Sequence, residues 1–251
     1  MRVAVPAVVF ALLLCVIAIV PSVWADPVPI TLFNTGVGTD GNLVPDGGVD
    51  PHYSLIASAD PSFPGPNTYT LMNPGTFPLY PGFWTPNTSI SKWIAPDPNN
   101  YVSYETGTGV YHTTFAQGYY AYQTTFYLPH SFNSKKDTAA ITGLWATDNT
   151  GFDILINGLS TGNYIPFYSP EGVASWHDLH PLSITGGFDK GLNTLEFIIW
   201  EGGASPTGLH VQMTGTYDLK PIPEPTTFAL VGMGILSLFT FAGLSRRRGR
   251  F

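Results

Sequence analysis

The chain has 251 residues, a formal net charge of −7, and ten Lys and Arg against 17 Asp and Glu. Half of the basic residues lie near the two ends, so the segment 26–220 carries five Lys, no Arg and 16 acidic residues. This balance argues strongly against nucleic acid or anionic lipid as a partner, because both are bound through basic side chains.

The first 25 residues have the features of a secretory signal peptide. Arg2 is a short basic start, the segment 7–20 is apolar, and Val-Trp-Ala places the small residue Ala25 before Asp26. We expect signal peptidase to cut between Ala25 and Asp26. The single cysteine, Cys15, leaves with this segment, so the exported chain has no disulfide or thiolate chemistry.

The exported segment 26–220 predicts one all-β domain. Its apolar residues alternate with period two, and Gly-rich and Pro-rich loops connect the alternating runs. The first part, 26–100, is expected to form a loose arm that packs on the rest. The expected strands lie at 53–58, 90–94, 119–128, 139–146, 152–156, 182–185, 192–200 and 209–213, with a hairpin turn at Asn157-Gly158. This pattern indicates an antiparallel β-sandwich or jelly roll.

Tryptophan side chains give the best indication of a binding site. Exposed indole faces stack on sugar rings, and neighbouring Asp and Asn side chains bind hydroxyl groups. Trp145 and Trp200 lie in expected strands and are predicted to be buried. The candidates for a sugar-binding surface lie in expected loops and are Trp84, Trp93, Trp176, Asp148 and Asn149. The alternative, that these rings also build the core, stays open.

A loop rich in oxygen ligands suggests a calcium site. Asp148, Asn149 and Asp153 offer the carboxylate and amide oxygens that calcium prefers. The alternative is a turn held by side chain to backbone hydrogen bonds. The same two interpretations apply to the three Asp residues of the Gly-rich run 36–50. We expect no other cofactor.

Sequence signatures of catalysis are missing. The chain contains no Gly-x-Ser-x-Gly, and His177 and His180 lack a recognisable third zinc ligand. The carboxylate pair of a glycosidase comes from distant strands and is not visible as a motif. We predict that the protein is not an enzyme, with a secreted glycoside hydrolase as the alternative.

The C-terminal segment joins an apolar run to a basic end. Residues 226–244 carry no charge over 19 positions, and a helix of that length covers about 28 Å, close to the thickness of a bilayer core. Four arginines follow, namely Arg246, Arg247, Arg248 and Arg250. Arg beside a membrane span stays in the cytoplasm, so the sequence predicts one transmembrane helix with the body exported.

This segment resembles a known sorting signal. Pro223-Glu224-Pro225, the apolar run and the Arg cluster resemble the PEP-CTERM sorting signal of Gram-negative bacteria, over residues 221–251. The resemblance implies that exosortase recognises Pro-Glu-Pro and removes the helix, after a single-pass intermediate in the inner membrane. It also implies delivery to the cell surface or the extracellular space, usually in bacteria that make extracellular polysaccharide.

A second resemblance covers Tyr119 to Tyr217. The runs YAYQTTFYLP, AAITGLWATDNTGFDILINGLSTG and LNTLEFIIWEGGASPTGLHVQM look like the galactose-binding-like jelly roll of glycosidase accessory domains. We therefore expect a non-catalytic surface or matrix protein that binds extracellular polysaccharide. A purely structural or adhesive surface protein is the further alternative.

Overall fold

The computed structural model describes residues 26–71, 84–98, 115–203, 205–220 and 234. The chain divides into two compact units, a body at Pro27–Leu219 and a second unit formed by the two ends. The predicted signal peptide lies outside the described residues, and so do the sorting signal and the transmembrane segment 226–244 apart from residue 234. Among the residues that are described, no helix is long and apolar enough to cross a membrane.

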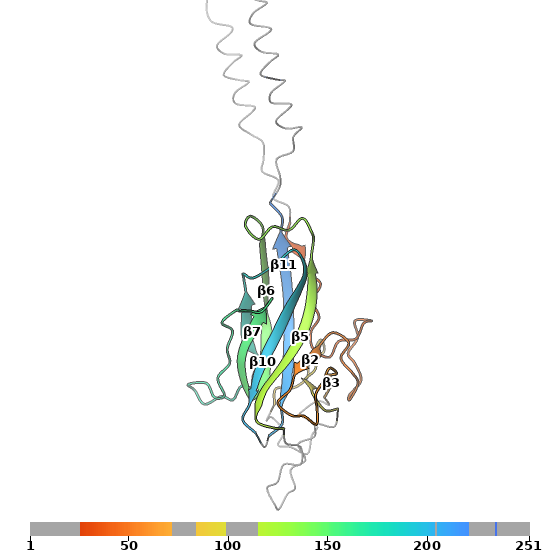
Figure 1. Cartoon of the computed structure of the whole chain (residues 1–251), viewed down its shortest axis with the longest axis vertical. Coiled ribbons are helices and arrows are strands. Elements are labelled where there is room, and N and C mark those ends of the chain that lie inside the picture. Colours follow the sequence, from red (N-terminus) through yellow and green to blue (C-terminus); the bar gives the residue numbers. More distant parts are fainter. Residues whose placement is uncertain (1–25, 72–83, 99–114, 204, 221–233, 235–251) are drawn as a thin grey trace, which may run out of the picture. The chain divides into compact units, whose positions relative to one another are not determined.

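The body is all-β and consists of two antiparallel sheets (Figure 1). The six-stranded sheet has the order β3-β4-β11-β6-β9, with β1 also paired to β11, and the five-stranded sheet has the order β2-β5-β10-β7-β8. The strands are β1 Val28–Pro29, β2 Ser54–Ala57, β3 Tyr69–Thr70, β4 Ile94–Ala95, β5 Gly118–Leu128, β6 Thr138–Asp148, β7 Thr150–Ile156, β8 Leu159–Ser160, β9 His180–Ile184, β10 Gly191–Glu201 and β11 Gly208–Asp218.

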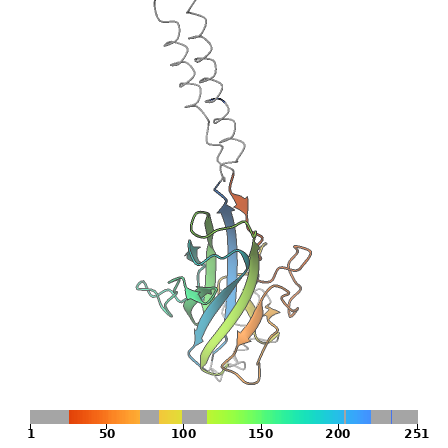
Figure 2. The same ribbon diagram turned by 45° about the horizontal axis from the view of Figure 1, so that its top comes forward.

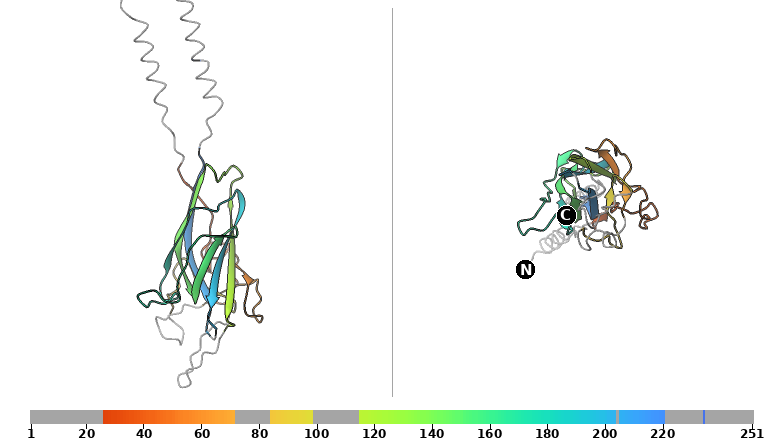
Figure 3. Two further views of the ribbon diagram at one scale, coloured as in Figure 1. Left: turned by 60° about the vertical axis from the view of Figure 1, so that its left-hand side comes forward. Right: turned by 90° about the horizontal axis from the view of Figure 1, so that it is seen from below.

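One hydrophobic core lies between the two sheets. The long strands β5, β6, β10 and β11 have 11 residues each and run side by side in pairs (Figures 2 and 3). On β10, Leu195, Phe197 and Ile199 are fully buried, and they pack with inward residues of the other sheet such as Trp145 and Val211. Period-two alternation places such residues on one face of a strand, which is why the sequence predicts this core.

The N-terminal part of the body contributes strands to both sheets. β1 pairs with the end of β11, β2 pairs with β5, and β3 and β4 extend the six-stranded sheet beyond the start of β11. The expected strand at 90–94 is wrong except at its last residue, because only Ile94 and Ala95 pair. The backbone N–H of Trp93 instead donates to the side-chain oxygen of Asn87, at 2.8 Å, and holds a loop.

A β-bulge changes the alternation that the sequence suggests for β7. Ile154 and Ile156 are buried as expected, but Phe152 is 48% exposed. The register against β10 shifts there, since Ile198 pairs with Asp153 whereas Ile199 pairs with Gly151. The extra residue turns Phe152 outward. There it meets Tyr119, at 5.1 Å between ring centroids.

Two other local predictions have clear outcomes. The hairpin at Asn157-Gly158 is confirmed, because Ile156 pairs with Leu159 and both turn residues have positive φ, 51° and 77°. Trp200 is only half-buried rather than buried, because it lies on the outer face of β10 beside Tyr119. The galactose-binding-like assignment stays a prediction.

Candidate functional site

The three predicted sugar-binding tryptophans come together in one cluster on the outer face of the six-stranded sheet. Trp93 and Trp176 belong to a second hydrophobic cluster, and Trp84 packs against it. The ring centroids of Trp84 and Trp93 are 4.3 Å apart, and the backbone N–H of Thr85 donates to the carbonyl of Trp176 at 2.8 Å. The structure therefore joins two loops that are far apart in the sequence.

This tryptophan cluster corrects the prediction of an exposed platform. Trp93 is 0% exposed and Trp176 is 7% exposed, while Trp84 is half-buried. The reason lies in the sheet beneath them. Small residues, Gly208 on β11 and Ala146 on β6, leave room above the strands, and the indoles fill it. Large apolar rings gain more from such burial than from solvent.

Asp148 and Asn149 anchor the cluster to the end of the two sheets. The indole Nε1 of Trp84 donates to Asp148 Oδ2 at 3.0 Å, and Asn149 Nδ2 donates to Asp148 Oδ1 at 2.5 Å. The oxygen Oδ1 of Asn149 accepts from the backbone N–H of Gly202 at 2.8 Å, and its carbonyl accepts from the hydroxyl of Ser175. Both side chains are 4% exposed, so they hold loops together and offer little surface to a ligand.

A second buried carboxyl lies near this junction. Glu201, at the end of β10, is 0% exposed; its Oε1 accepts from Ser205 Oγ at 2.5 Å and from the backbone N–H of Gly203 at 2.9 Å. Its other oxygen, Oε2, has no hydrogen-bond partner in the described residues. Burial raises the pKa of Glu201 from 4.5 to about 7. Burial, and then the charge of Glu201, raise the pKa of Asp148 well above its usual range.

The described residues do not assemble a recognisable metal site. No group of three or more His, Cys, Asp or Glu side chains in them lies close enough to hold an ion. Of the predicted calcium ligands, both oxygens of Asp148 accept hydrogen bonds, and Asp153 Oδ1 accepts from the backbone N–H of Ile154 at 2.8 Å. In the Gly-rich run, Asp50 is buried and accepts from three backbone N–H groups, whereas Asp46 pairs with Lys92 at 2.6 Å.

A serine-histidine pair also lies at the tryptophan cluster. Ser91 Oγ and His210 Nε2 are 2.6 Å apart, and both residues are 0% exposed. Burial lowers the pKa of His210 to about 4, so the ring is neutral at neutral pH. A serine nucleophile needs a base held by a third group, but His210 Nδ1 has no partner in the described residues. The pair connects the N-terminal arm to β11.

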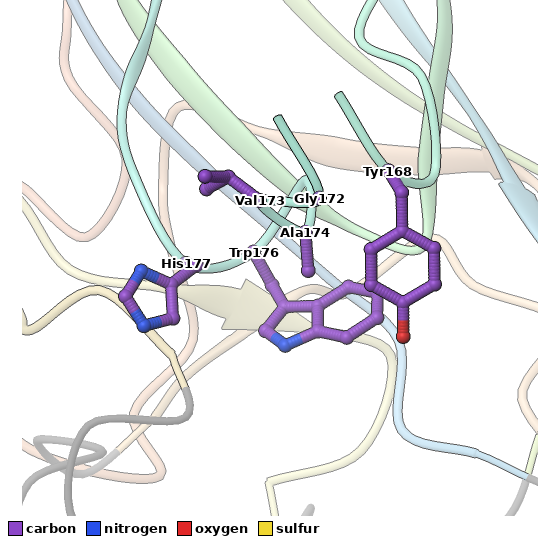
Figure 4. A pocket seen from close by; sticks show the side chains of 6 residues that line it. All are labelled: Tyr168, Gly172, Val173, Ala174, Trp176 and His177. Carbon is purple, nitrogen blue, oxygen red and sulfur yellow. The ribbon is translucent and has the colours of Figure 1, made fainter. Parts of the chain in front are cut away.

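An open pocket with aromatic walls lies beside the tryptophan cluster. It has a volume of about 310 Å³ and is lined by Tyr168, Gly172, Val173, Ala174, Trp176 and His177. Figure 4 shows the indole of Trp176 between the rings of Tyr168 and His177. Tyr168 is 54% exposed, and its ring centroid lies 6.0 Å from that of Trp176. Of the predicted sugar-binding residues, Trp176 alone lines this pocket.

A short turn positions the pocket. The backbone bridge between Tyr168 and Ala174 closes a loop whose tip is Gly172, at φ 82°. Phe167 packs edge-on against both neighbouring rings, at 4.6 Å from Tyr168 and 5.2 Å from Trp176. Sequence reasoning did not select Phe167 or Tyr168. The sequence feature that could have indicated these two aromatic residues is the run NYIPFYSPEG, in which aromatic residues lie among turn-forming residues.

The comparison with protein families identifies the tail. The model described as the PEP-CTERM protein-sorting motif matches residues 221–248, which include Pro223-Glu224-Pro225 and three of the four terminal arginines. No curated protein matches the chain. The motif indicates export, recognition by exosortase and sorting to the cell surface. The chain therefore carries a PEP-CTERM protein-sorting motif behind an all-β body.

Proposed function

We propose that this is a non-catalytic, exosortase-sorted surface protein that binds neutral carbohydrate of the extracellular matrix. The sorting motif supports the destination, and the resemblance of the body to a galactose-binding-like jelly roll supports the ligand class. Exosortase engages Pro223-Glu224-Pro225 after signal peptidase has exposed Asp26. The chain is then a single-pass intermediate of the inner membrane of a Gram-negative cell until the span is removed.

The observation that carries the sugar proposal is the pocket of Tyr168, Trp176 and His177. An exposed phenol ring offers a face for the apolar side of a sugar, and Trp176 supplies an apolar floor. His177 and Asp178, which pair at 3.6 Å and are exposed, provide hydrogen-bonding groups nearby. A shallow site of this kind binds with a dissociation constant on the order of micromolar to millimolar, about −8 to −4 kcal/mol.

The burial of one carboxyl pair supports the non-catalytic part of the proposal. Among the described residues, Asp148 and Glu201 are a carboxyl pair whose charges interact, but they are 4% and 0% exposed. Glycosidases need two carboxyl groups that both reach the scissile bond and water. A buried pair of this kind favours a structural role over the hydrolase alternative.

A glycan array with a matched pair of variants tests the sugar proposal. The intact chain, kept in a detergent without sugar headgroups, should bind neutral glycans, and Tyr168→Ala should lower the affinity at least about tenfold. Tyr164 is the control, because it is 57% exposed on the same loop but does not line the pocket. If the unmodified chain binds no glycan, or Tyr164→Ala weakens binding as much as Tyr168→Ala, the sugar site is refuted.

A further inference from the structure

Positive charge in the body gathers at one end. Pro27–Leu219 has four lysines, and three of them lie in the two loops at this end, Lys135 and Lys136 between β5 and β6 and Lys190 before β10. The strand pairs prove the placement. Leu128 at the end of β5 pairs with Gly191, and Thr138 at the start of β6 pairs with Asp218 at the end of β11.

These lysines are accessible. Lys135 and Lys190 are exposed and Lys136 is half-buried. Neither of the two ion pairs within the described residues includes any of them. Asp26 and Asp189 are the exposed carboxylates at this end, Asp218 is half-buried like Lys136, and Asp137 is 6% exposed. The remainder of Pro27–Leu219 has one lysine, Lys92, and 12 carboxylates.

Exposed apolar side chains accompany the lysines. Leu192 and Tyr127 are opposite each other on β10 and β5, and they are 66% and 52% exposed. The hydroxyl of Tyr127 lies 2.5 Å from Nε2 of His130 in the adjoining loop. Tyrosine beside lysine is the composition of protein surfaces that lie at the boundary between a bilayer and water.

This end is also where the body leads into the sorting tail. β11 ends at Asp218, and Leu219 packs against the main core. Seven residues then reach Thr226, where the predicted span begins, so the connecting chain is at most about 25 Å long. The end of the body that carries three of its four lysines is thus the end that the sorting tail follows.

We propose that this basic end, formed by Lys135, Lys136 and Lys190 with Tyr127 and Leu192, lies against the anionic phospholipid headgroups of the membrane that holds the tail. The acidic remainder of the body is repelled from the same surface. The inference rests on the anchored intermediate of the proposed function. The balance of five Lys against 16 acidic residues in segment 26–220 hides this asymmetry, which is why it argued against anionic lipid.

Lysine footprinting of the intact chain in vesicles tests the proposal. The chain is reconstituted in phosphatidylcholine alone, or with about one third phosphatidylglycerol, and acetylated before mass spectrometry. A lysine at an anionic surface gains about fivefold in binding, so acetylation of Lys135, Lys136 and Lys190 should fall by about that factor in the anionic vesicles. Lys92, which pairs with Asp46 elsewhere in the body, should not change. Salt at about 0.5 M should remove the protection.

Two double variants with the same change in net charge test whether the protection depends on the lysines at this end or on the total charge of the protein. Lys135→Gln with Lys190→Gln should return the acetylation of Lys136 to its value in neutral vesicles. The control variant is Ser62→Glu with Asn67→Glu, which lowers the net charge by the same two units as the lysine variant. These positions lie near Asp60, which accepts from the backbone N–H of Ala116 at the end of the body opposite the lysines. This variant should leave the protection of the lysines intact.

The outcomes distinguish the two proposals. Flotation of the same vesicles shows whether the chain is bound to them. If the chain floats with both kinds of vesicle but is acetylated equally in both, the basic face is overturned and the membrane anchor is supported. A chain that floats with neither overturns the anchor and the face together. A chain that floats only with anionic vesicles supports the face and refutes the anchor. Protection of Lys92 equal to that of Lys190 would also overturn the face.

Discussion

Replacing Glu201 by glutamine tests the buried carboxyl at the end of β10. Glutamine keeps the oxygen that accepts from Ser205 Oγ and Gly203 N–H, and it removes the ability to ionise. The folded protein holds the Glu201 proton up to a pKa of about 7, whereas the unfolded chain releases it near 4.5. The folded state therefore binds more protons in this window, and its stability falls as pH rises from about 4.5 to about 7.

The size of the effect follows from the shift. A pKa that rises from 4.5 to about 7 corresponds to about 3 kcal/mol of unfolding free energy, at 1.36 kcal/mol for each unit. For a body of this size, that amount lowers the melting temperature by about 6 to 12 °C. Burial also raises the pKa of Asp148, so part of the decline with pH survives in the variant.

Melting curves at a series of pH values measure this effect. Between about pH 4 and about pH 8, the melting temperature of the unmodified protein should fall more steeply than that of Glu201→Gln, by the amount given above. Glu196→Gln is the control, because Glu196 lies on the opposite, outer face of the same strand and bonds to Gln123. Parallel profiles for the unmodified protein and Glu201→Gln would show that Glu201 ionises freely and would refute the reasoning.

Three further predictions concern stability and assembly. Trp93→Ala should lower the unfolding free energy by about 3 to 5 kcal/mol in urea titrations, since the ring is 0% exposed; a loss below about 1 kcal/mol would contradict the packed cluster. Asn163→Ala should increase aggregation in light scattering, because the Asn163 amide bonds both the N–H and the carbonyl of Ser183 on the open edge of β9; unchanged scattering would mean that this edge needs no cover. Millimolar calcium should leave the melting temperature unchanged, because both oxygens of Asp148 already accept hydrogen bonds, and a rise would restore the calcium site.

The long strands were predictable because their chemistry is local. Period-two alternation along β10 and β11, and the Asn157-Gly158 turn, determine faces and a hairpin without knowledge of neighbours. The outward turn of Phe152 was not predictable, since it depends on the register against β10. Sequence alone also gave no sign that loops would cover the outer face above Gly208, which is why the tryptophans looked exposed.

The same limit applies to the charges. Lys135 and Lys190 are 55 positions apart in the sequence, and the pairing of Leu128 with Gly191 brings their loops to one end. Glu201 and Asp148 likewise meet because the β6–β7 and β10–β11 junctions lie together. Which side chains from different strands lie together depends on the strand topology, and the composition of the chain does not reveal it.

The central claim, that the chain is exported and sorted by exosortase, is tested most directly by the intact mass of the mature protein. In a host with exosortase, the released protein should begin at Asp26 and lack residues 226–251, and Glu224→Ala should leave the tail attached. The same chain in a host without exosortase should keep the tail and stay with the membrane. Released protein that still carries the Arg-rich tail, or a Glu224→Ala variant processed like the unmodified chain, would contradict the claim.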